Sequence, residues 1–409
     1  MKKTITTSTI VSFLMLAILS VFVLSPYIMQ PTKAIISGVW LLFLVAVTFL
    51  ILKTGKTSRY RSIFFIIFAF SFVLSFIAGL IEDRGSMALT QEVINNNETP
   101  LCPVAIPQLI LPLIFRHELI FPTKIIGGPH GGFVAIFLLW VVGFLALGRG
   151  WCSWGCFFGG IDEGFSKVLK KPLINSRKIN PKILLIPFVV LIVIVGWSFM
   201  AMEPKYCEWF CPLKLVTEYV EINSLLTYLQ AIVFITLGMG LLFILPTLMK
   251  KRTQCGLFCP LGALQSVISP INLYRVETDA SKCTGCGRCQ TICPTFSIKK
   301  TGGNIHRASI TCTRCGKCMD ECPEKAIHYT LKGCRTVDQP LSRRIRTRLS
   351  GLKGRLLAHP VLVAEEIFEP RTLFVFTAII FGGTLSGSMV TDAFYRIYLL
   401  ITTGSMLVY

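Results

Sequence analysis

The sequence has few charged residues and very few histidines. Only 15% of its 409 residues are Asp, Glu, Lys or Arg, and five are histidine. Soluble domains typically contain about 25% charged residues, so the deficit argues against an ordinary soluble enzyme. A Walker phosphate-binding loop, a Gly-rich dinucleotide fingerprint and a nucleophile triad are also missing. The chain therefore offers no recognisable site for group-transfer chemistry.

Hydrophobic residues are abundant, at 53% of the chain, and they gather into runs of membrane-spanning length. We predict six spans and a weaker seventh, at residues 8–27, 34–52, 62–81, 131–148, 182–202, 227–249 and 371–390. No small-residue cleavage site follows the first run, so we interpret it as an anchor and not as a signal peptide. The predicted fold is mainly α, a polytopic helical membrane protein with one soluble segment.

Acidic residues are scarce, with 21 against 41 Lys and Arg, which gives a formal net charge of +20. The basic residues gather at the ends of alternate spans: Lys53, Lys56, Arg59, Arg61, Arg149, Lys167, Lys170, Lys171, Lys250, Lys251, Arg252, Arg343, Arg344 and Arg346. This positive-inside pattern predicts a multi-pass protein of the cytoplasmic (inner) membrane, with the N-terminus and the soluble segment in the cytoplasm. We expect the basic runs to face lipid headgroups and predict no nucleic-acid partner.

Cysteine is plentiful, with 16 residues, and eight of them form two runs of the spacing C-x2-C-x2-C-x3-C, each followed by proline. The doubled run is typical of bacterial two-cluster [4Fe–4S] ferredoxins, in which the fourth cysteine of each run ligates the other cluster. This crossed assignment gives Cys283, Cys286, Cys289 and Cys322 for one cluster, and Cys312, Cys315, Cys318 and Cys293 for the other. We place both in an α+β ferredoxin domain at residues 276–335.

Zinc knuckles and disulfides are the alternatives for these eight cysteines. Zinc sites usually combine pairs of C-x2-C, not triplets with a trailing C-P. Disulfides are rare in proteins that face a reducing cytosol. Both comparisons favour iron–sulfur clusters.

A second set of cysteines forms three C-x3-C pairs within a predicted membrane core at residues 131–265. The pairs are Cys152 and Cys156, Cys207 and Cys211, and Cys255 and Cys259. Residues i and i+4 share a helix face, so each pair is expected to present two thiols side by side. Spans four and six end on the same side, which predicts that the first and third pairs converge on a third iron–sulfur cluster at the cytoplasmic membrane boundary. The alternative is buried free cysteines that pack as small hydrophobes.

The remaining pair ends span five and is predicted on the outer face, together with Cys102. Cys102, Cys207 and Cys211 would hold an outer cluster if His117 or His130 supplied a fourth ligand. Equally, the pair would form a disulfide or a redox-active dithiol, with Cys102 free. Each of the two histidines is also a candidate haem ligand or proton acceptor for a quinol.

The other segments carry weaker signals. The outer loop at 82–130 contains an apolar, proline-broken stretch at 103–122, which is either a re-entrant segment or a loop packed on the helices. Three N-terminal spans occupy residues 1–81, a basic linker follows the ferredoxin at 336–370, and residues 371–409 hold the last span and a tail that we place on the outer surface from Thr391. We expect ordinary structural or surface roles for Cys334, His306, His328 and His359.

At these residues the chain resembles the NapH-type family of membrane ferredoxins, which also includes MauN-like proteins and the C-terminal part of NosR. The match lies in residues 151–156 (WCSWGC), residues 255–263 (CGLFCPLGA) and the two ferredoxin runs, and it covers roughly residues 125–330. Three features depart from the family pattern: Phe157 replaces a usual proline, Cys207 and Cys211 add a pair, and extra spans flank the core.

The resemblance implies an electron-transfer subunit of a quinol-dehydrogenase-type oxidoreductase complex. Such a protein relays electrons between its clusters and a quinone pool, or an extracytoplasmic partner such as a cytochrome or iron–sulfur subunit. Two alternatives are an electron donor for metalloenzyme maturation, like CcoG, and a redox regulator, like NosR. A regulator would require a flavin or signalling domain, and no such domain is recognisable in the sequence.

Overall fold

The computed structural model describes most of the chain. The described residues are 5–84, 88–89, 108, 111–112, 115, 141–174, 181–202, 204–212, 214, 219–220, 222–302, 305–332 and 361–407. Within them, seven helices are long and apolar enough to cross a membrane: Ile5–Tyr27, Pro31–Thr54, Thr57–Glu82, Val141–Phe165, Lys182–Ala201, Leu225–Met249 and Pro370–Thr403. They confirm the predicted polytopic helical membrane fold.

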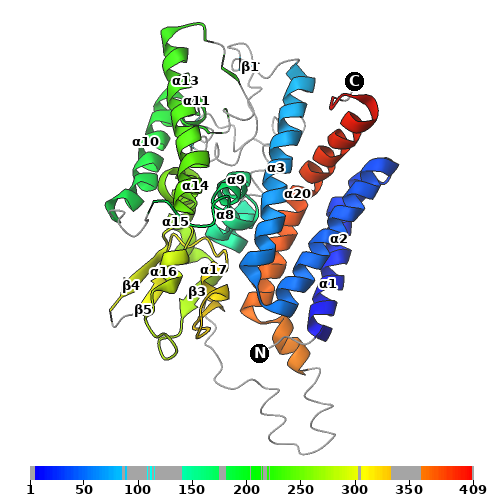
Figure 1. Ribbon diagram of the computed structural model, residues 1–409, viewed down its shortest axis with the longest axis vertical. Helices are drawn as coiled ribbons and strands as arrows, with labels where there is room; N and C mark the ends of the chain where they lie inside the picture. Colours follow the sequence, from blue (N-terminus) through cyan, green and yellow to red (C-terminus); the bar gives the residue numbers. More distant parts are fainter. Residues whose placement is uncertain are drawn as a thin grey trace, which may run out of the picture.

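Helices from both ends of the chain form one bundle, on the right of Figure 1. Its members are α1 (Ile5–Leu19) with its continuations η1 (Ser20–Leu24) and η2 (Ser25–Tyr27), α2 (Pro31–Thr54), α3 (Thr57–Arg84) and α20 (Pro370–Thr403). Proline occupies the first turn of α2 and α20, where its missing N–H costs no helix bond. Gly55 and Gly404 end these two helices in the left-handed conformation. Leu44, Phe64 and Phe374 belong to the shared core.

The last helix is longer than predicted. We expected a weak span at 371–390 and a surface tail from Thr391, but α20 continues to Thr403 and buries Thr391. Polar side chains in its second half pair with each other and with α3: Arg396 contacts Glu82 and Asp392, at 2.6 Å each. These ion pairs explain how the helix keeps charged residues within the bundle after the hydrophobic run has ended.

A second group of helices carries the cysteine pairs, and its bounds are η3 (Gly148–Gly150), α8 (Trp151–Trp154), α9 (Phe157–Phe165), η5 (Pro181–Leu185), α10 (Ile186–Ala201), α11 (Lys205–Trp209), α13 (Leu225–Gly238), η6 (Met239–Ile244), α14 (Leu245–Met249), η7 (Gln254–Phe258), α15 (Pro260–Ile268) and η8 (Ser269–Ile271). A capping box between Ser224 and Thr227 begins α13. Strands β1 (Ala88–Leu89) and β2 (Tyr219–Val220) form a short parallel pair. In Figure 1, α8 and α9 lie between this group and the bundle, where α9 packs on α3 and α8 on α20.

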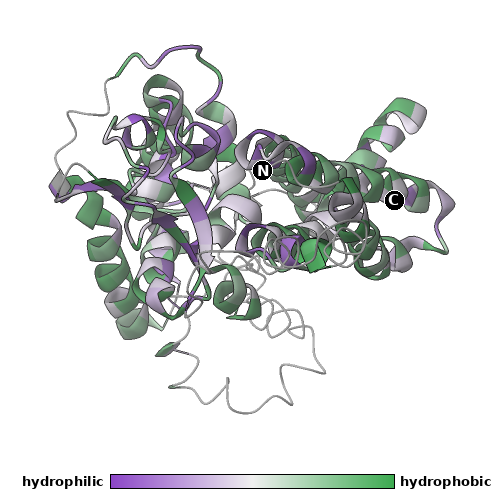
Figure 2. Cartoon of the chain, turned by 90° about the horizontal axis from the view of Figure 1, so that it is seen from below, coloured by the Kyte–Doolittle hydropathy of each residue, from purple (hydrophilic) through white to green (hydrophobic). Residues whose placement is uncertain are grey.

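The ferredoxin domain is a small α+β unit at one end of the helices. Strand β3 (Tyr274–Thr278) pairs antiparallel with β6 (Ile327–Leu331), β4 (Ile298–Thr301) pairs with β5 (Ile305–Ala308), and short helices α16 (Arg288–Ile292) and α17 (Lys317–Asp320) follow the cysteine loops. Figure 2 shows hydrophilic residues gathered on this unit and hydrophobic residues on the helices. The rings of Tyr274 and Tyr329 pack on Phe374 of α20, so the ferredoxin is seated on the helix bundle.

Candidate iron–sulfur centres

The two halves of the ferredoxin repeat each other in backbone conformation as well as in sequence. Matching positions with positive φ are Gly285 and Arg314, Gly287 and Gly316, and Phe296 and Lys325. In the first of these matches the residue types differ: the first half has Gly285, whereas the second half has Arg314 in a backbone conformation that favours glycine. Its guanidinium donates to the carbonyl oxygen of Leu147 at 2.7 Å and to Ser269 Oγ at 3.3 Å. A Cβ on Gly148 would lie 2.6 Å from Arg314 Nη1. Arg314 therefore anchors the ferredoxin to the membrane helices, and Gly148 makes room for it.

The first predicted cluster site coincides with a cavity. The four cysteines of the crossed assignment, Cys283, Cys286, Cys289 and Cys322, all line it. Three come from the first run and one from the second, because α16 and α17 pack side by side. The structure therefore brings together the residues that crossed ligation requires, while the ligation itself stays a prediction.

The second predicted set of cysteines is more deeply buried than the first. Cys293, Cys315 and Cys318 are buried, and Cys312 is partly exposed. Burial raises the pKa of the Cys318 thiol well above its usual range, and the neighbouring Cys312, Cys315 and Cys293 thiolates raise it further. Such a thiol stays protonated at neutral pH until a metal displaces the proton. The backbone N–H of Ser297 donates to Cys293 Sγ at 3.2 Å, the kind of bond that tunes a ligating sulfur.

Cys152, Cys156, Cys255 and Cys259, hereafter the tetrad, also come together. Their side chains are 5–7% exposed, and they lie close enough to interact electrostatically with one another. This convergence of the first and third pairs is the arrangement that a third cluster requires. A Cβ on Gly159 would lie 2.1 Å from the carbonyl oxygen of Cys152, so only glycine allows α9 to pass this close to the tetrad.

The thiols of the first and third pairs do not share a helix face, which corrects our prediction for these two pairs. Helix α8 ends at Trp154, and Cys156 is extended, with φ −104° and ψ 116°. Cys259 is likewise extended, at φ −64° and ψ 117°, between η7 and α15. Pro260 forces this conformation, because a residue before proline avoids the helical region. Cys156 adopts the same conformation before Phe157, so the missing family proline does not change the local geometry.

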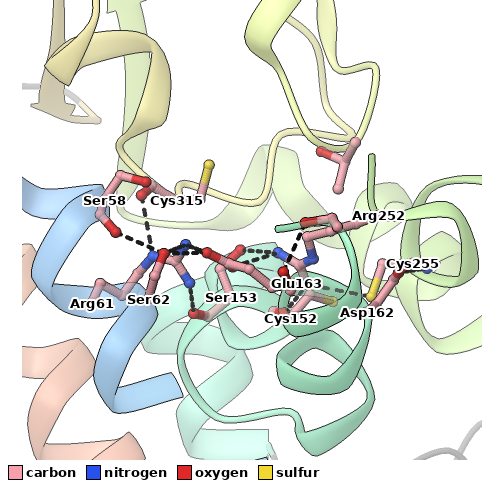
Figure 3. A network of polar contacts seen from close by, with 12 residues as sticks. Ser58, Arg61, Ser62, Cys152, Ser153, Asp162, Glu163, Arg252, Cys255 and Cys315 are labelled. Carbon is pink, nitrogen blue, oxygen red and sulfur yellow. Dashed lines mark hydrogen bonds and ion pairs between the residues drawn. The ribbon is translucent and has the colours of Figure 1, made fainter. Parts of the chain in front are cut away.

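A buried polar network connects the tetrad with the second ferredoxin set (Figure 3). Arg61 of α3 forms a bidentate ion pair with Glu163 of α9, at 2.6 and 2.7 Å. The same guanidinium donates to the carbonyl oxygens of Ser153 at 2.6 Å and Cys315 at 3.3 Å. Because Ser153 follows Cys152 directly, one side chain contacts the backbone of the second ferredoxin set and the backbone next to the tetrad.

A second arginine completes the network on the tetrad side. Arg252 donates to the carbonyl oxygen of Cys152, to Ser153 Oγ at 2.7 Å and to Cys255 Sγ at 3.3 Å, and it lies 4.0 Å from Glu163. The carboxylate of Asp162 accepts the backbone N–H groups of Thr253 and Cys255, at 3.1 and 3.0 Å. The loop that carries Cys255 is therefore fixed by two charged side chains from different directions.

Four of the basic residues do not follow our expectation that the basic runs face lipid headgroups, whereas Lys53, Lys56, Arg59 and Lys170 are exposed. Arg61, Arg149, Lys251 and Arg252 are all buried. Lys251 donates to the carbonyl oxygen of Cys293 at 2.7 Å, and Arg149 to that of Cys255 at 3.0 Å. The bias in charge did not indicate this burial, because only the folded chain brings the carboxylate and carbonyl partners to these side chains.

Buried donors without partners test whether the tetrad suits an iron–sulfur cluster. Within the described part of the chain, the N–H groups at Arg149 Nε, Trp151 Nε1, Arg252 Nε and Gln265 Nε2 are buried and donate to no hydrogen-bond acceptor. All four belong to residues next to or in contact with the tetrad; Gln265, for example, accepts from Cys152 Sγ at 2.9 Å. Cluster sulfurs accept N–H groups, and unsatisfied buried donors are costly. The donor set therefore fits a cluster at this position.

A single metal ion would require a tighter grouping. Thiolates around tetrahedral zinc lie within about 4 Å of one another, since the Zn–S distance is about 2.3 Å. Among the residues that the structure describes, no three His, Cys, Asp or Glu side chains are grouped so that they would hold one metal ion.

The outer pair lies nearer to the tetrad than the sequence indicated. Cys211, Tyr206, Cys156 and Cys259 belong to one buried cluster, and Tyr206 Oη accepts from Gln254 Nε2 at 3.2 Å. Gln108, for which the sequence carries no signal, has a buried amide that donates to Cys207 Sγ at 3.4 Å and accepts from Tyr206 N at 2.8 Å. Three other residues predicted as possible cofactor ligands, Cys102, His117 and His130, lie outside the described residues. Cys334 lies outside them as well.

One histidine that we expected at the surface is buried. His306 lines the first ferredoxin cavity beside the four cysteines, and its Nδ1 has no partner among the described residues. A buried imidazole in the wall of a metal site typically orients or tunes the ligands. The only sequence signal for this burial is the alternation of buried and exposed side chains along β5, and a strand of four residues is too short to distinguish a buried face from an exposed one.

Comparison with known proteins finds two family models that match segments of this chain. A family model described as a 4Fe-4S binding domain matches at residues 129–175, 183–223 and 231–272, and a 4Fe-4S dicluster domain matches at 275–323. Each of the first three matches contains one C-x3-C pair. No solved structure matches the chain significantly.

Three curated relatives show how far the similarity extends. An uncharacterised protein of Methanocaldococcus jannaschii is 28% identical over 177 residues, 42% of this chain and 68% of the relative. The ferredoxin-type protein NapH of Escherichia coli is 28% identical over 151 residues, 37% of this chain and 49% of NapH. The methylamine utilization ferredoxin-type protein MauN of Methylobacillus flagellatus is 24% identical over 148 residues, 25% of this chain and 52% of MauN. The chain thus spans about half to two thirds of these relatives, and it is, as its motifs predicted, a relative of the ferredoxin-type proteins NapH and MauN that contains 4Fe-4S binding domains.

Proposed function

We propose that this protein relays electrons between its ferredoxin domain and a quinone pool or a redox partner on the far side of the membrane. The observation that carries the proposal is the double contact of Arg61 with the carbonyl oxygens of Cys315 and Ser153. It connects the second ferredoxin set, through one side chain, to the residue that follows Cys152 of the tetrad. The names of NapH and MauN, which are ferredoxin-type proteins, support the same class of function.

Three sets of cysteines would hold the cofactors. Two are the crossed ferredoxin sets, and the third is the tetrad at the ferredoxin side of the membrane core. When bound, [4Fe–4S] clusters supply one-electron transfer at potentials that depend on burial, charge and hydrogen bonds to sulfur. In this proposal the ferredoxin domain is cytoplasmic, and Cys102, Cys207 and Cys211 are the candidates for an additional centre on the outer side.

The chain's own residues perform the remaining tasks. The burial of the tetrad excludes water, and the two arginines place positive charge between two sites that would carry negative charge. One carboxylate, Glu163, holds both arginines in place. Charges fixed in a buried site act strongly, because the local dielectric constant is low. The network therefore stabilises added electrons on either side of it and keeps the two sites in a fixed arrangement.

The function is tested by removing the tetrad. The double variant Cys152→Ala/Cys255→Ala should lose about four irons per chain and keep the two ferredoxin clusters. Protein reduced with dithionite and freed of excess reagent should be reoxidised by a water-soluble quinone analogue, and the variant should lose at least about tenfold in this rate. Iron analysis and stopped-flow absorbance measure the two effects. Cys334→Ala, predicted to ligate nothing, is the matched control. Unchanged iron content, or equal reoxidation rates, would refute the assignment.

A further inference from the structure

A basic cleft opens on the ferredoxin, beside the second cysteine set. It has a volume of about 600 Å³, and its lining includes three arginines, Arg275, Arg307 and Arg314, against one acidic residue, Glu277. Arg275 and Arg307 are exposed, and neither pairs with a carboxylate among the described residues. Ser269, Thr278 and Ser309 add hydroxyl groups to the same cleft. Guanidinium and hydroxyl groups together are suited to a phosphate.

The rim of the cleft concentrates like charge. In the antiparallel pairing of β4 with β5, Lys299 lies directly opposite Arg307, and both are exposed. Like charges directly opposite each other destabilise a strand pair. An anion bound at the cleft would remove this repulsion.

Contacts with the membrane helices hold the cleft close to the end of a membrane span. The side-chain amide of Asn272 donates to the carbonyl oxygens of Phe144 and Leu145, at 3.0 and 2.8 Å. These two residues belong to the span Val141–Phe165. Ile271 and Leu273, beside the cleft in sequence, are 66% and 56% exposed. Exposed apolar side chains next to unpaired arginines are typical of the level at which acyl chains meet headgroups.

We propose that this cleft binds the headgroup of one anionic phospholipid. Arg275 and Arg307 hold the phosphate, and the acyl chains lie over Ile271 and Leu273. An acidic protein partner would satisfy the arginines, but it would not cover apolar residues at membrane level. A lipid does both.

The position of the cleft gives the lipid a consequence that rests on the proposed function. Cys312 lines the cleft and is the one member of the second set that is not buried. A phosphate beside it adds negative charge and disfavours the addition of an electron at that site. Anionic lipid should therefore lower the reduction potential of the second ferredoxin centre.

The test uses the full-length protein in nanodiscs of phosphatidylglycerol or phosphatidylcholine. Native mass spectrometry should show one retained phosphatidylglycerol on the wild type, and retention should fall about tenfold or more in Arg275→Gln/Arg307→Gln, since both charge-assisted bonds to the phosphate are lost. Lys300→Gln/Lys325→Gln removes two exposed charges that do not line the cleft and should behave like the wild type.

Redox titration followed by EPR should give a lower potential in phosphatidylglycerol than in phosphatidylcholine for the wild type and the control, and no difference for the arginine variant. Equal lipid retention by wild type and arginine variant would overturn the site. Inorganic phosphate that reproduces the shift in phosphatidylcholine would identify a free-phosphate site instead. Unchanged retention together with slower reduction by a soluble acidic ferredoxin would identify a protein dock. Lipid retention does not depend on the clusters, so failure of the relay would leave this result unaffected.

Discussion

Replacement of Cys322 and Cys286 together by alanine should remove about four irons per chain, whereas replacement of Cys322 and Cys315 together should remove about eight. In the crossed arrangement Cys322 and Cys286 ligate the same cluster, so replacing the second of them removes no further iron. Cys322 and Cys315 ligate different clusters, so replacing both cysteines removes both clusters. The basis is the cavity that Cys322 lines together with the first run. Iron analysis with EPR of the dithionite-reduced protein measures the outcome.

The design discriminates between the two ligation patterns because they predict opposite results. If each run served its own cluster, the Cys322 and Cys315 pair would remove about four irons and the Cys322 and Cys286 pair about eight. Cys293→Ala combined with Cys315→Ala is the reciprocal control and should remove about four. Equal losses in all three double variants would contradict both patterns and show that the ferredoxin unfolds when any ligand is lost.

Arg61→Met should destabilise the protein by about 3–5 kcal/mol, because it leaves the buried Glu163 carboxylate without its bidentate partner. Arg61→Met/Glu163→Met should recover only part of this loss, because it removes the unpaired carboxylate but also takes from the buried Arg252 the carboxylate at 4.0 Å. The free energy of unfolding from denaturant titration in detergent measures both effects. Arg61 contacts the backbone carbonyl oxygen of Cys315, which ligates nothing in the predicted cluster, so neither variant should lose ferredoxin iron while folded.

Arg59→Met is the matched control for this prediction. Arg59 lies two residues earlier on α3, is exposed, and should tolerate the same substitution within about 0.5 kcal/mol. Similar losses for Arg59→Met and Arg61→Met would mean that α3 tolerates methionine poorly, whatever the pairing. A double variant as unstable as Arg61→Met would mean that the network has another essential partner for the arginine.

Some of the protein follows from sequence alone. Hydropathy over about twenty residues is a local property, and so most spans were predictable. Two were not predicted in full, because the fourth reaches Phe165 where we expected residue 148, and the last reaches Thr403 where we expected residue 390. The cysteine spacing is also local, and its duplication implied a crossed pattern that the first cavity matches. The convergence of Cys152, Cys156, Cys255 and Cys259 followed from topology, because alternate spans must end on the same side.

Local patterns failed where proline or long-range partners decide the conformation. The C-x3-C spacing indicated one helix face, but Cys156 and Cys259 are extended between short helices. Pro260 was visible in the sequence and carried that information through its restriction of the preceding residue. Cys156 offered no such signal. Its conformation depends on the close packing of α9, which Gly159 allows.

The sequence by itself determined the membrane spans, the ferredoxin repeat and the identity of the cysteines, because each depends on residues that are neighbours along the chain. Only the tertiary structure decided what lies between the cysteine sets. Arg61, Glu163 and Arg252 are separated by about ninety residues or more, and no local rule pairs them. A basic residue after a span is expected to face lipid headgroups unless the fold offers it a buried hydrogen-bond acceptor. Here the acceptors are the Glu163 carboxylate and backbone carbonyl oxygens, and they reach the arginines only when α3, α9 and the loop before η7 pack against one another.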